Sequence, residues 1–185
     1  PIYLEGSFND VKIQLAMQYT TAYEEETLTF VNNIKTVEGG THLTGFKTVL
    51  TKTMNDLGRK HNILKEKDQN LQGEDVREGL TAILSVFVKE PQFEGQTKAK
   101  LGNEEAYEAV IKVVKEKMEE FFDYNQKDLK LILTKALEAA RATLAAKKAR
   151  EMVRRKNVLE NTTLPGKLAD CISENIEETE IFIVE

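Results

Sequence analysis

Residues 11–19 read Val-Lys-Ile-Gln-Leu-Ala-Met-Gln-Tyr, and this stretch decides the fold class. Apolar or aromatic side chains stand at every second position from Val11 to Tyr19. Nine residues with a period of two predict a strand with one buried face. Residues 27–36 are rich in β-branched and aromatic side chains and predict a second strand, antiparallel to the first.

Helical spacing follows these two strands. Large apolar residues recur every three or four positions and predict an amphipathic helix over 42–58, with Gly58 as a left-handed cap near its end. Residues 59–73 have no period and predict a loop, followed by a short turn at 75–79. The apolar run 80–88 then predicts a third, more deeply buried strand.

Two further helices are predicted in the second half of the chain. Asn103 is placed to cap a helix over 104–122, and Asn125 with Asp128 resembles a capping box that starts a helix over 126–156. No glycine or proline interrupts the chain between Asn125 and Pro165. Strands first, with helices between and after them, predict an α+β domain of layered type.

The composition excludes several classes of protein. The chain has 185 residues, of which 41% are hydrophobic and 31% charged, as expected for a soluble globular protein. No apolar run approaches the ~18 residues of a membrane span. One cysteine, Cys171, excludes an internal disulfide, and two histidines with one cysteine exclude a conventional zinc site. Because the chain starts at Pro1 without a leader, we expect a fragment of a longer protein with no export signal.

Charge is unevenly distributed along the chain. The net charge of −5 conceals a block of +6 over residues 141–156, followed by −6 over residues 157–185. The block is either a solvated face or a contact with the phosphate backbone of a nucleic acid. Its candidate DNA-facing side chains are Lys147, Lys148, Arg150, Arg154, Arg155 and Lys156.

The segment from Pro91 to Asn103 is the strongest candidate for binding chemistry. It places Gln96 and Lys98 in a glycine-containing loop before a helix, where a lysine charge and an amide donor can grip phosphate. It is not a Walker A loop, because its threonine precedes Lys98 instead of following it. The alternative is a solvated surface loop. Glu185 ends a predicted final strand over 181–184, where a carboxylate can serve as a magnesium ligand, although strand ends commonly finish in polar residues.

Four sequence motifs stand in order along the chain. They are Phe-Val-Asn-Asn-Ile-Lys-Thr-Val-Glu-Gly-Gly-Thr-His at 30–42, Gly-Glu-Asp-Val-Arg-Glu-Gly-Leu-Thr at 73–81, Gln-Phe-Glu-Gly-Gln-Thr-Lys at 92–98 and Leu-Pro-Gly-Lys-Leu-Ala-Asp-Cys at 164–171. Together they resemble the ATPase subunits of bacterial type IIA topoisomerases. The resemblance covers essentially the whole chain, and the details favour the gyrase B branch over topoisomerase IV.

The resemblance implies an architecture and a set of partners. It implies a transducer domain over 1–163, with a ribosomal protein S5 domain 2-like α+β fold and a long C-terminal helix, and the start of a Toprim domain over 164–185. A GHKL-type ATP-binding domain is expected before Pro1. The implied cofactors, ATP and Mg²⁺, require domains outside this stretch. The implied partners are DNA, the A subunit of DNA gyrase and a second B subunit in an A2B2 complex, in the cytoplasm and without a membrane.

The resemblance also implies roles for individual residues. Lys98 and Gln96 are expected to touch the γ-phosphate of ATP bound in the neighbouring domain, with Lys98 contributing to catalysis, and Glu185 is expected to be a metal ligand only in the intact protein. Hydrolysis would then move a gate for DNA passage. The alternatives are a topoisomerase IV transducer, a stand-alone nucleotide hydrolase and a non-catalytic S5-like nucleic-acid-binding module. We expect this stretch by itself to be inactive.

Overall fold

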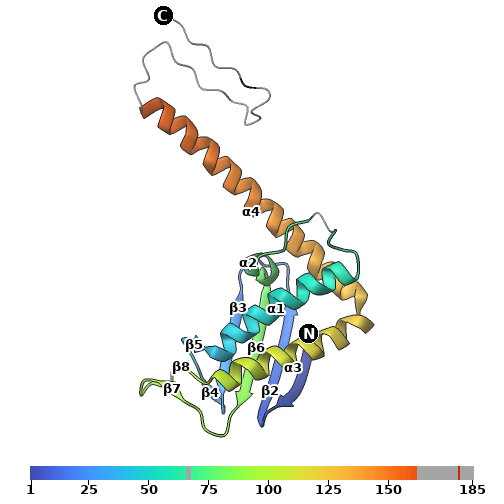
Figure 1. Cartoon of the computed structure of the whole chain (residues 1–185), viewed down its shortest axis with the longest axis vertical. Helices are drawn as coiled ribbons and strands as arrows, with labels where there is room; N and C mark the ends of the chain where they lie inside the picture. Colours follow the sequence, from blue (N-terminus) through green and yellow to red (C-terminus); the bar gives the residue numbers. More distant parts are fainter. Residues whose placement is uncertain (66–67, 162–178, 180–185) are drawn as a thin grey trace, which may run out of the picture. The chain divides into compact units, whose positions relative to one another are not determined.

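The computed structural model describes residues 1–65, 68–161 and 179, with the side chains of the long last helix described as far as Arg154 (Figure 1). The chain divides into two compact units, Pro1–Arg141 and Ala142–Glu185. Among the described residues, no helix combines the length and apolar character needed to cross a bilayer.

The first unit is built on a five-stranded sheet in the order β1-β2-β6-β3-β4. All neighbouring strands are antiparallel except β6 and β3, which run parallel. A second, small sheet has the order β5-β8-β7. The strands are β1 (Ile2–Phe8), β2 (Val11–Tyr19), β3 (Glu26–Val31), β4 (Ile34–Lys35), β5 (Gly39–Gly40), β6 (Leu80–Phe87), β7 (Phe93–Glu94) and β8 (Lys100–Leu101).

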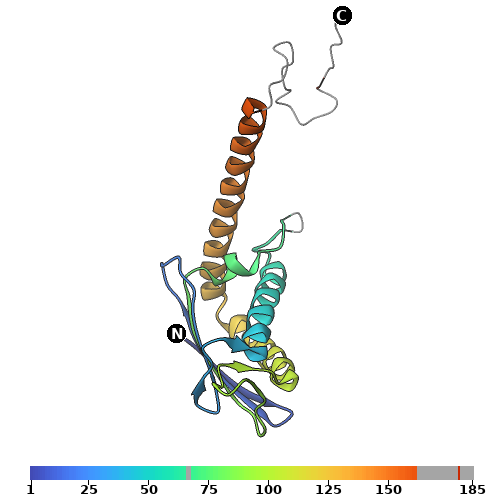
Figure 2. The same cartoon turned by 90° about the vertical axis from the view of Figure 1, so that its left-hand side faces the viewer.

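Two helices cover one face of the larger sheet (Figures 1 and 2). The core lies between them and the sheet, where Phe46, Met118 and Leu84 are fully buried. On the opposite face Ile83 of β6 is 46% exposed and Tyr3 of β1 is 59% exposed. The sheet is therefore half-buried, as period two predicts. The helices are α1 (Thr41–Lys60), α2 (Gly73–Arg77), α3 (Glu104–Tyr124) and α4 (Gln126–Asn161).

The helices predicted over 42–58, 104–122 and 126–156 are confirmed as α1, α3 and α4, which extend two to five residues beyond the predicted C-terminal ends. The α+β class is also confirmed. The strand over 11–19 is confirmed as β2. Helix α4 has 36 residues and is therefore about 54 Å long. Its first half carries buried Leu129, Leu133 and Ala136, whereas every residue from Arg141 to Arg154 is exposed.

Several strand predictions are wrong. The run 27–36 is two strands, because Asn32 and Asn33 adopt φ of 47° and 66° and close a two-residue hairpin turn. β3 runs opposite to β2 but does not pair with it, since β6 lies between them. The strand β1 is absent from the sequence prediction. β6 is buried on one face only, because Ile83 points outward.

The predicted turns and caps also need correction. Gly58 lies inside α1, which ends at Lys60, and the close approach of the Leu64 side chain leaves no room for a side chain there. The turn at 75–79 is the short helix α2 followed by Gly79, whose φ is +71°. Asn103 precedes α3 but makes no side-chain cap hydrogen bond. Asn125 donates its side-chain amide to the carbonyl oxygen of Phe121, at the end of α3.

Candidate functional site

The Gln-Thr-Lys segment is the tip of a short hairpin. β7 and β8 pair through Phe93 with Leu101 and Glu94 with Lys100, so residues 95–99 form the tip. The predicted loop over 91–102 therefore contains two short strands. Gly95 has a φ of +83° and Lys98 a φ of +53°, an uncommon conformation for a residue with a side chain.

Lys98 is exposed at this tip. No hydrogen bond or ion pair joins its side chain to any residue that the structure describes. Lys100, two residues further on, is paired with Glu94 at 3.0 Å between Nζ and Oε2. The hairpin thus neutralises one of its two lysines internally and presents the other to solvent, together with exposed Gln96. A group placed in this way can bind an anion that lies outside the unit.

The base of the hairpin is held by the Glu-Gly-Gly segment that precedes α1. The amide of Glu38 donates to the carbonyl of Ala99 at 3.0 Å, and β5 pairs with β8 through Gly40 and Leu101. Gly40 has a φ of +133°, and a Cβ there would lie 2.5 Å from the amide nitrogen of Leu101. Only glycine permits this approach of two backbones. The tip is therefore tied directly to the start of α1.

Asn103 closes the other side of the hairpin base. Its side chain accepts a hydrogen bond from the amide of Gln92 at 2.6 Å and donates to the carbonyl of Glu90 and to a carboxylate oxygen of Glu105, each at 3.1 Å. Asn103 is 5% exposed. Asn103 therefore fixes the loop against the start of α3. Its position in the sequence predicts a different role, that of a cap for this helix.

A buried polar chain lies beside the same base. Nε2 of His42 is 3.1 Å from Oγ1 of Thr36, which in turn is 2.7 Å from Oγ1 of Thr29. Burial lowers the pKa of His42 to about 4, so its ring is neutral at pH 7. Its Nδ1 has no hydrogen-bond partner among the described residues. These features are those of a buried structural residue.

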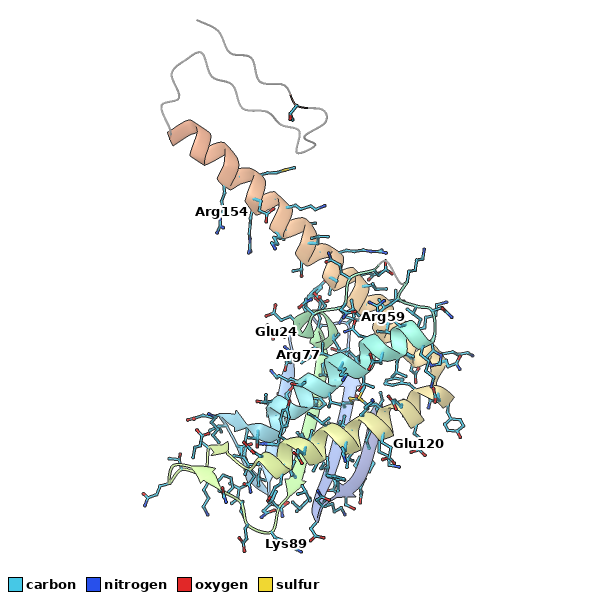
Figure 3. The ribbon with its side chains drawn as sticks, viewed as in Figure 1. Glu24, Arg59, Arg77, Lys89, Glu120 and Arg154 are labelled. Carbon is cyan, nitrogen blue, oxygen red and sulfur yellow. The ribbon has the colours of Figure 1, made fainter. Side chains whose placement is uncertain are left out.

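The basic block lies on the second half of α4. Lys147, Arg150 and Arg154 share one face, because they are spaced by three and four residues, and all are exposed. Lys148 is also exposed, and Figure 3 labels Arg154 on this helix. No ion pair involves these four side chains within the described part of the chain. The side chains of Arg155 and Lys156, and the whole of Glu185 and Cys171, lie outside the described residues.

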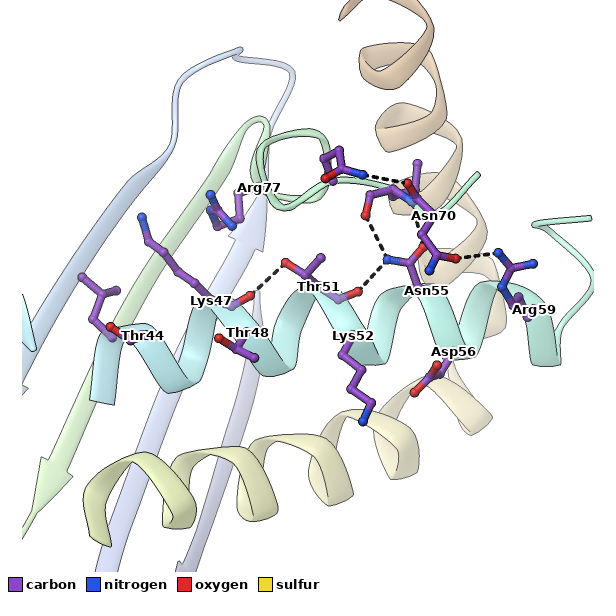
Figure 4. Close-up of a pocket in the computed structure, with 13 residues that line it drawn as sticks. Thr44, Lys47, Thr48, Thr51, Lys52, Asn55, Asp56, Arg59, Asn70 and Arg77 are labelled. Atoms are coloured by element: carbon purple, nitrogen blue, oxygen red, sulfur yellow. Dashed lines mark hydrogen bonds between the residues drawn. The ribbon is translucent and has the colours of Figure 1, made fainter. Parts of the chain in front are cut away.

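Sequence reasoning missed a polar groove along α1 (Figure 4). Four cations line it, but three of them are held by the chain itself. Lys47 and Arg77 pair with Glu25 at 2.7 and 2.8 Å, and Arg59 donates to the side chain of Asn70 at 2.5 Å. The groove combines residues of α1 with residues 70–72 and 77, which follow the helix after a loop, so no local sequence signal indicates it. The cations are Lys47, Lys52, Arg59 and Arg77.

Solved structures similar to this chain include ATPase and ATP-binding domains of bacterial type II topoisomerases. The 43K ATPase domain of Thermus thermophilus gyrase B, solved with an aminocoumarin, superimposes with a TM-score of 0.76 at 40% identity, over 82% of this chain and 40% of that one. The topoisomerase IV ATP-binding domain of Francisella tularensis, solved with a small-molecule inhibitor, gives a TM-score of 0.69 at 26% identity, over 78% of this chain and 40% of that one.

Sequence comparison specifies the family more narrowly. The family model of DNA gyrase B matches residues 1–152, and the chain belongs to this family. It is 60% identical to the DNA gyrase B subunit of Thermotoga maritima over 96% of this chain and 28% of that protein. It is 55% identical to the DNA gyrase B subunit of Clostridium acetobutylicum over 100% of this chain and 29% of that protein. The chain therefore spans less than a third of the length of these relatives.

Proposed function

We propose that residues 1–163 are the S5-like transducer domain of a DNA gyrase B subunit, and that the Toprim domain starts within 164–185. The domain couples ATP binding and hydrolysis in the neighbouring ATP-binding domain to gate movement, DNA strand passage and negative supercoiling in the cytoplasm. The observation that carries this proposal is the exposed Lys98, which has no partner among the described residues and lies on a hairpin with a firmly held base. The match to a gyrase B ATPase domain supports it.

In this proposal Lys98 and Gln96 contact the γ-phosphate of ATP held by the ATP-binding domain. A preorganised cation at this phosphate stabilises the charge that develops as the phosphoryl group leaves. Lys100 does not share this role, since Glu94 neutralises it. The described residues contain no group of three histidine, cysteine or acidic side chains that could hold a metal ion. We therefore assign the Mg²⁺ that accompanies ATP to none of them.

The same contact provides a switch. Lys98 meets the terminal phosphate only while that phosphate is present, so hydrolysis removes the contact and releases the hairpin. The hairpin base is paired with β5, and β5 runs directly into α1. A displacement of the tip is therefore passed to a 20-residue helix at the centre of the unit.

Replacement of Lys98 by alanine in the intact gyrase heterotetramer tests the proposal. Loss of one charge-stabilising donor is expected to raise the hydrolysis barrier by ~3–4 kcal/mol, which lowers DNA-stimulated ATP turnover about 10²- to 10³-fold. Lys89→Ala is the matched control, because Lys89 is an exposed lysine at the preceding loop and pairs with Asp10. Normal turnover in Lys98→Ala would remove the assigned role.

We further propose that the basic block of α4 contacts DNA in the A2B2 assembly. Reversal of Lys147, Lys148, Arg150 and Arg154 to glutamate removes four cations that no described partner neutralises. If each of these cations meets one phosphate in the wild type, the slope of log K for DNA binding against log salt concentration becomes shallower by about 3.6 in the variant. Reversal of the exposed Lys127 and Lys130 at the start of α4 is the control. An unchanged slope in the fourfold variant would make the block a solvated face.

A further inference from the structure

Lys135 forms a polar link between α4 and the rest of the first unit. Its ammonium donates to the carbonyl oxygen of Thr20 at 2.6 Å and to that of Ala22 at 2.6 Å. Both acceptors belong to the connection between β2 and β3. Lys135 is only partly exposed, in contrast to Lys130, which faces solvent on the same helix.

The acceptor site is shaped by Gly79. The amide of Thr20 donates to the carbonyl of Gly79 at 2.9 Å, which brings the start of β6 against the β2–β3 connection. Gly79 has a φ of +71°, and a Cβ there would lie 2.5 Å from the carbonyl oxygen of Ala22 and would collide with the ammonium of Lys135. A glycine is thus required by the backbone conformation and by the space that the lysine occupies. This explains the glycine in the Arg-Glu-Gly segment.

The same connection is tied to α1 and α2 a few residues later. Glu25 accepts from Lys47 of α1 at 2.7 Å and from Arg77 of α2 at 2.8 Å. Burial opposes ionisation of Glu25, but these two partners hold the pKa of its carboxyl below its usual value. The carboxylate is therefore charged at neutral pH. The residues from Thr20 to Glu25 accept charged donors from three helices.

Lys135 adds a polar contact to the apolar packing that holds the first half of α4. Leu129 and Leu133 are fully buried and fix the helix by close packing. The hydrogen bonds of Lys135 are charge-assisted and directional, and they are made to the β2–β3 connection. Lys135 therefore connects the first half of α4 to this one segment of its own unit.

We infer that Lys135 is a positioning residue that couples the nucleotide-dependent hairpin to α4. This inference rests on the proposed function. The path runs from the hairpin base through β5 into α1, from Lys47 to Glu25, and along the β2–β3 connection to Lys135. The steps are a backbone pairing, a helix, two sets of charged hydrogen bonds and the short covalent stretch between Glu25 and Thr20. When the link is absent, ATP is still hydrolysed but its energy is less often converted into strand passage.

The test uses Lys135→Met in the intact gyrase heterotetramer. Methionine keeps an unbranched apolar stem and removes the donors. We expect ATP turnover within about twofold of the wild type and about fivefold fewer supercoils introduced per ATP, a change within the range typical of residues on coupling networks. Lys130→Met is the matched control and should leave both quantities unchanged. Hydrogen exchange of residues 20–25 should accelerate in Lys135→Met only.

Each alternative result is distinguishable. An unchanged number of supercoils per ATP in Lys135→Met overturns the inference, and so does a parallel fall of ATP turnover and supercoiling with a lowered melting temperature, which indicates a purely structural role. Because the proposed function is tested by ATP turnover in Lys98→Ala, its failure is seen separately from failure of the link.

Discussion

Gly40 offers a sharp quantitative test of how the hairpin is held. Its φ of 133° and ψ of −161° lie in a region that is essentially restricted to glycine. Alanine at this position is destabilised by about 1–3 kcal/mol through the backbone conformation. Its Cβ would also lie 2.5 Å from the amide nitrogen of Leu101, so β5 and β8 must separate. Such overpacking adds about 1–3 kcal/mol.

Gly95 is the matched control for this substitution. Its φ is +83°, but a Cβ there meets nothing within 4 Å. Gly95→Ala is therefore expected to cost about 1 kcal/mol, from the backbone alone. Urea unfolding of the 185-residue chain, followed by circular dichroism, should give Gly40→Ala a loss of about 4 kcal/mol, well above that of Gly95→Ala. Equal losses in the two variants would refute the close approach of β5 and β8 as the anchor of the hairpin.

Three further predictions concern polar residues of the first unit. The pKa of His42 is about 4 in the folded state and 6.5 in the unfolded chain. As the pH drops from 6.5 towards 4, the unfolded chain therefore binds a proton that the folded state does not, and the free energy of unfolding falls. Between pH 7 and pH 5 the wild type should lose about 2 kcal/mol more than His42→Phe, as measured by urea unfolding at both pH values. Asn103→Ala should cost about 2–3 kcal/mol and accelerate hydrogen exchange at Gln92, because three hydrogen bonds are lost; unchanged exchange would contradict this. Glu25→Gln should lower stability by about 1 kcal/mol by leaving Arg77 without its carboxylate, whereas Glu24→Gln, at a neighbouring position, should have no measurable effect on the melting temperature.

Sequence periodicity predicts those elements whose burial is regular. The alternation from Val11 to Tyr19 reappears as the burial pattern of β2, and the apolar stripe of α3 reappears as its buried face. β1 escapes prediction because only Ile2 and Leu4 of its seven residues are buried, too few for a period to emerge. The hairpin turn at Asn32 could have been found, since two consecutive asparagines are a signal for a turn with positive φ.

The candidate site, too, could be predicted only in part from the sequence. The residue types at Gln96 and Lys98 suggest phosphate binding. The sequence does not reveal that Glu94 neutralises Lys100, whereas Lys98 has no partner in the described part of the chain. That distinction depends on the register of β7 and β8, which pair over only two residues. Lys135 has no sequence signature at all, because its partners are backbone carbonyls more than 110 residues away.

We propose above that Lys98 recognises the terminal phosphate of a nucleotide held outside its own unit. Calorimetric titration of the intact B subunit with a non-hydrolysable ATP analogue and with ADP tests this proposal, in the wild type and in Lys98→Ala. Lys98→Ala should bind the analogue about 10- to 100-fold more weakly and bind ADP unchanged, because ADP lacks the phosphate that Lys98 is proposed to contact. Equal weakening of both ligands, or no weakening of either, would contradict it.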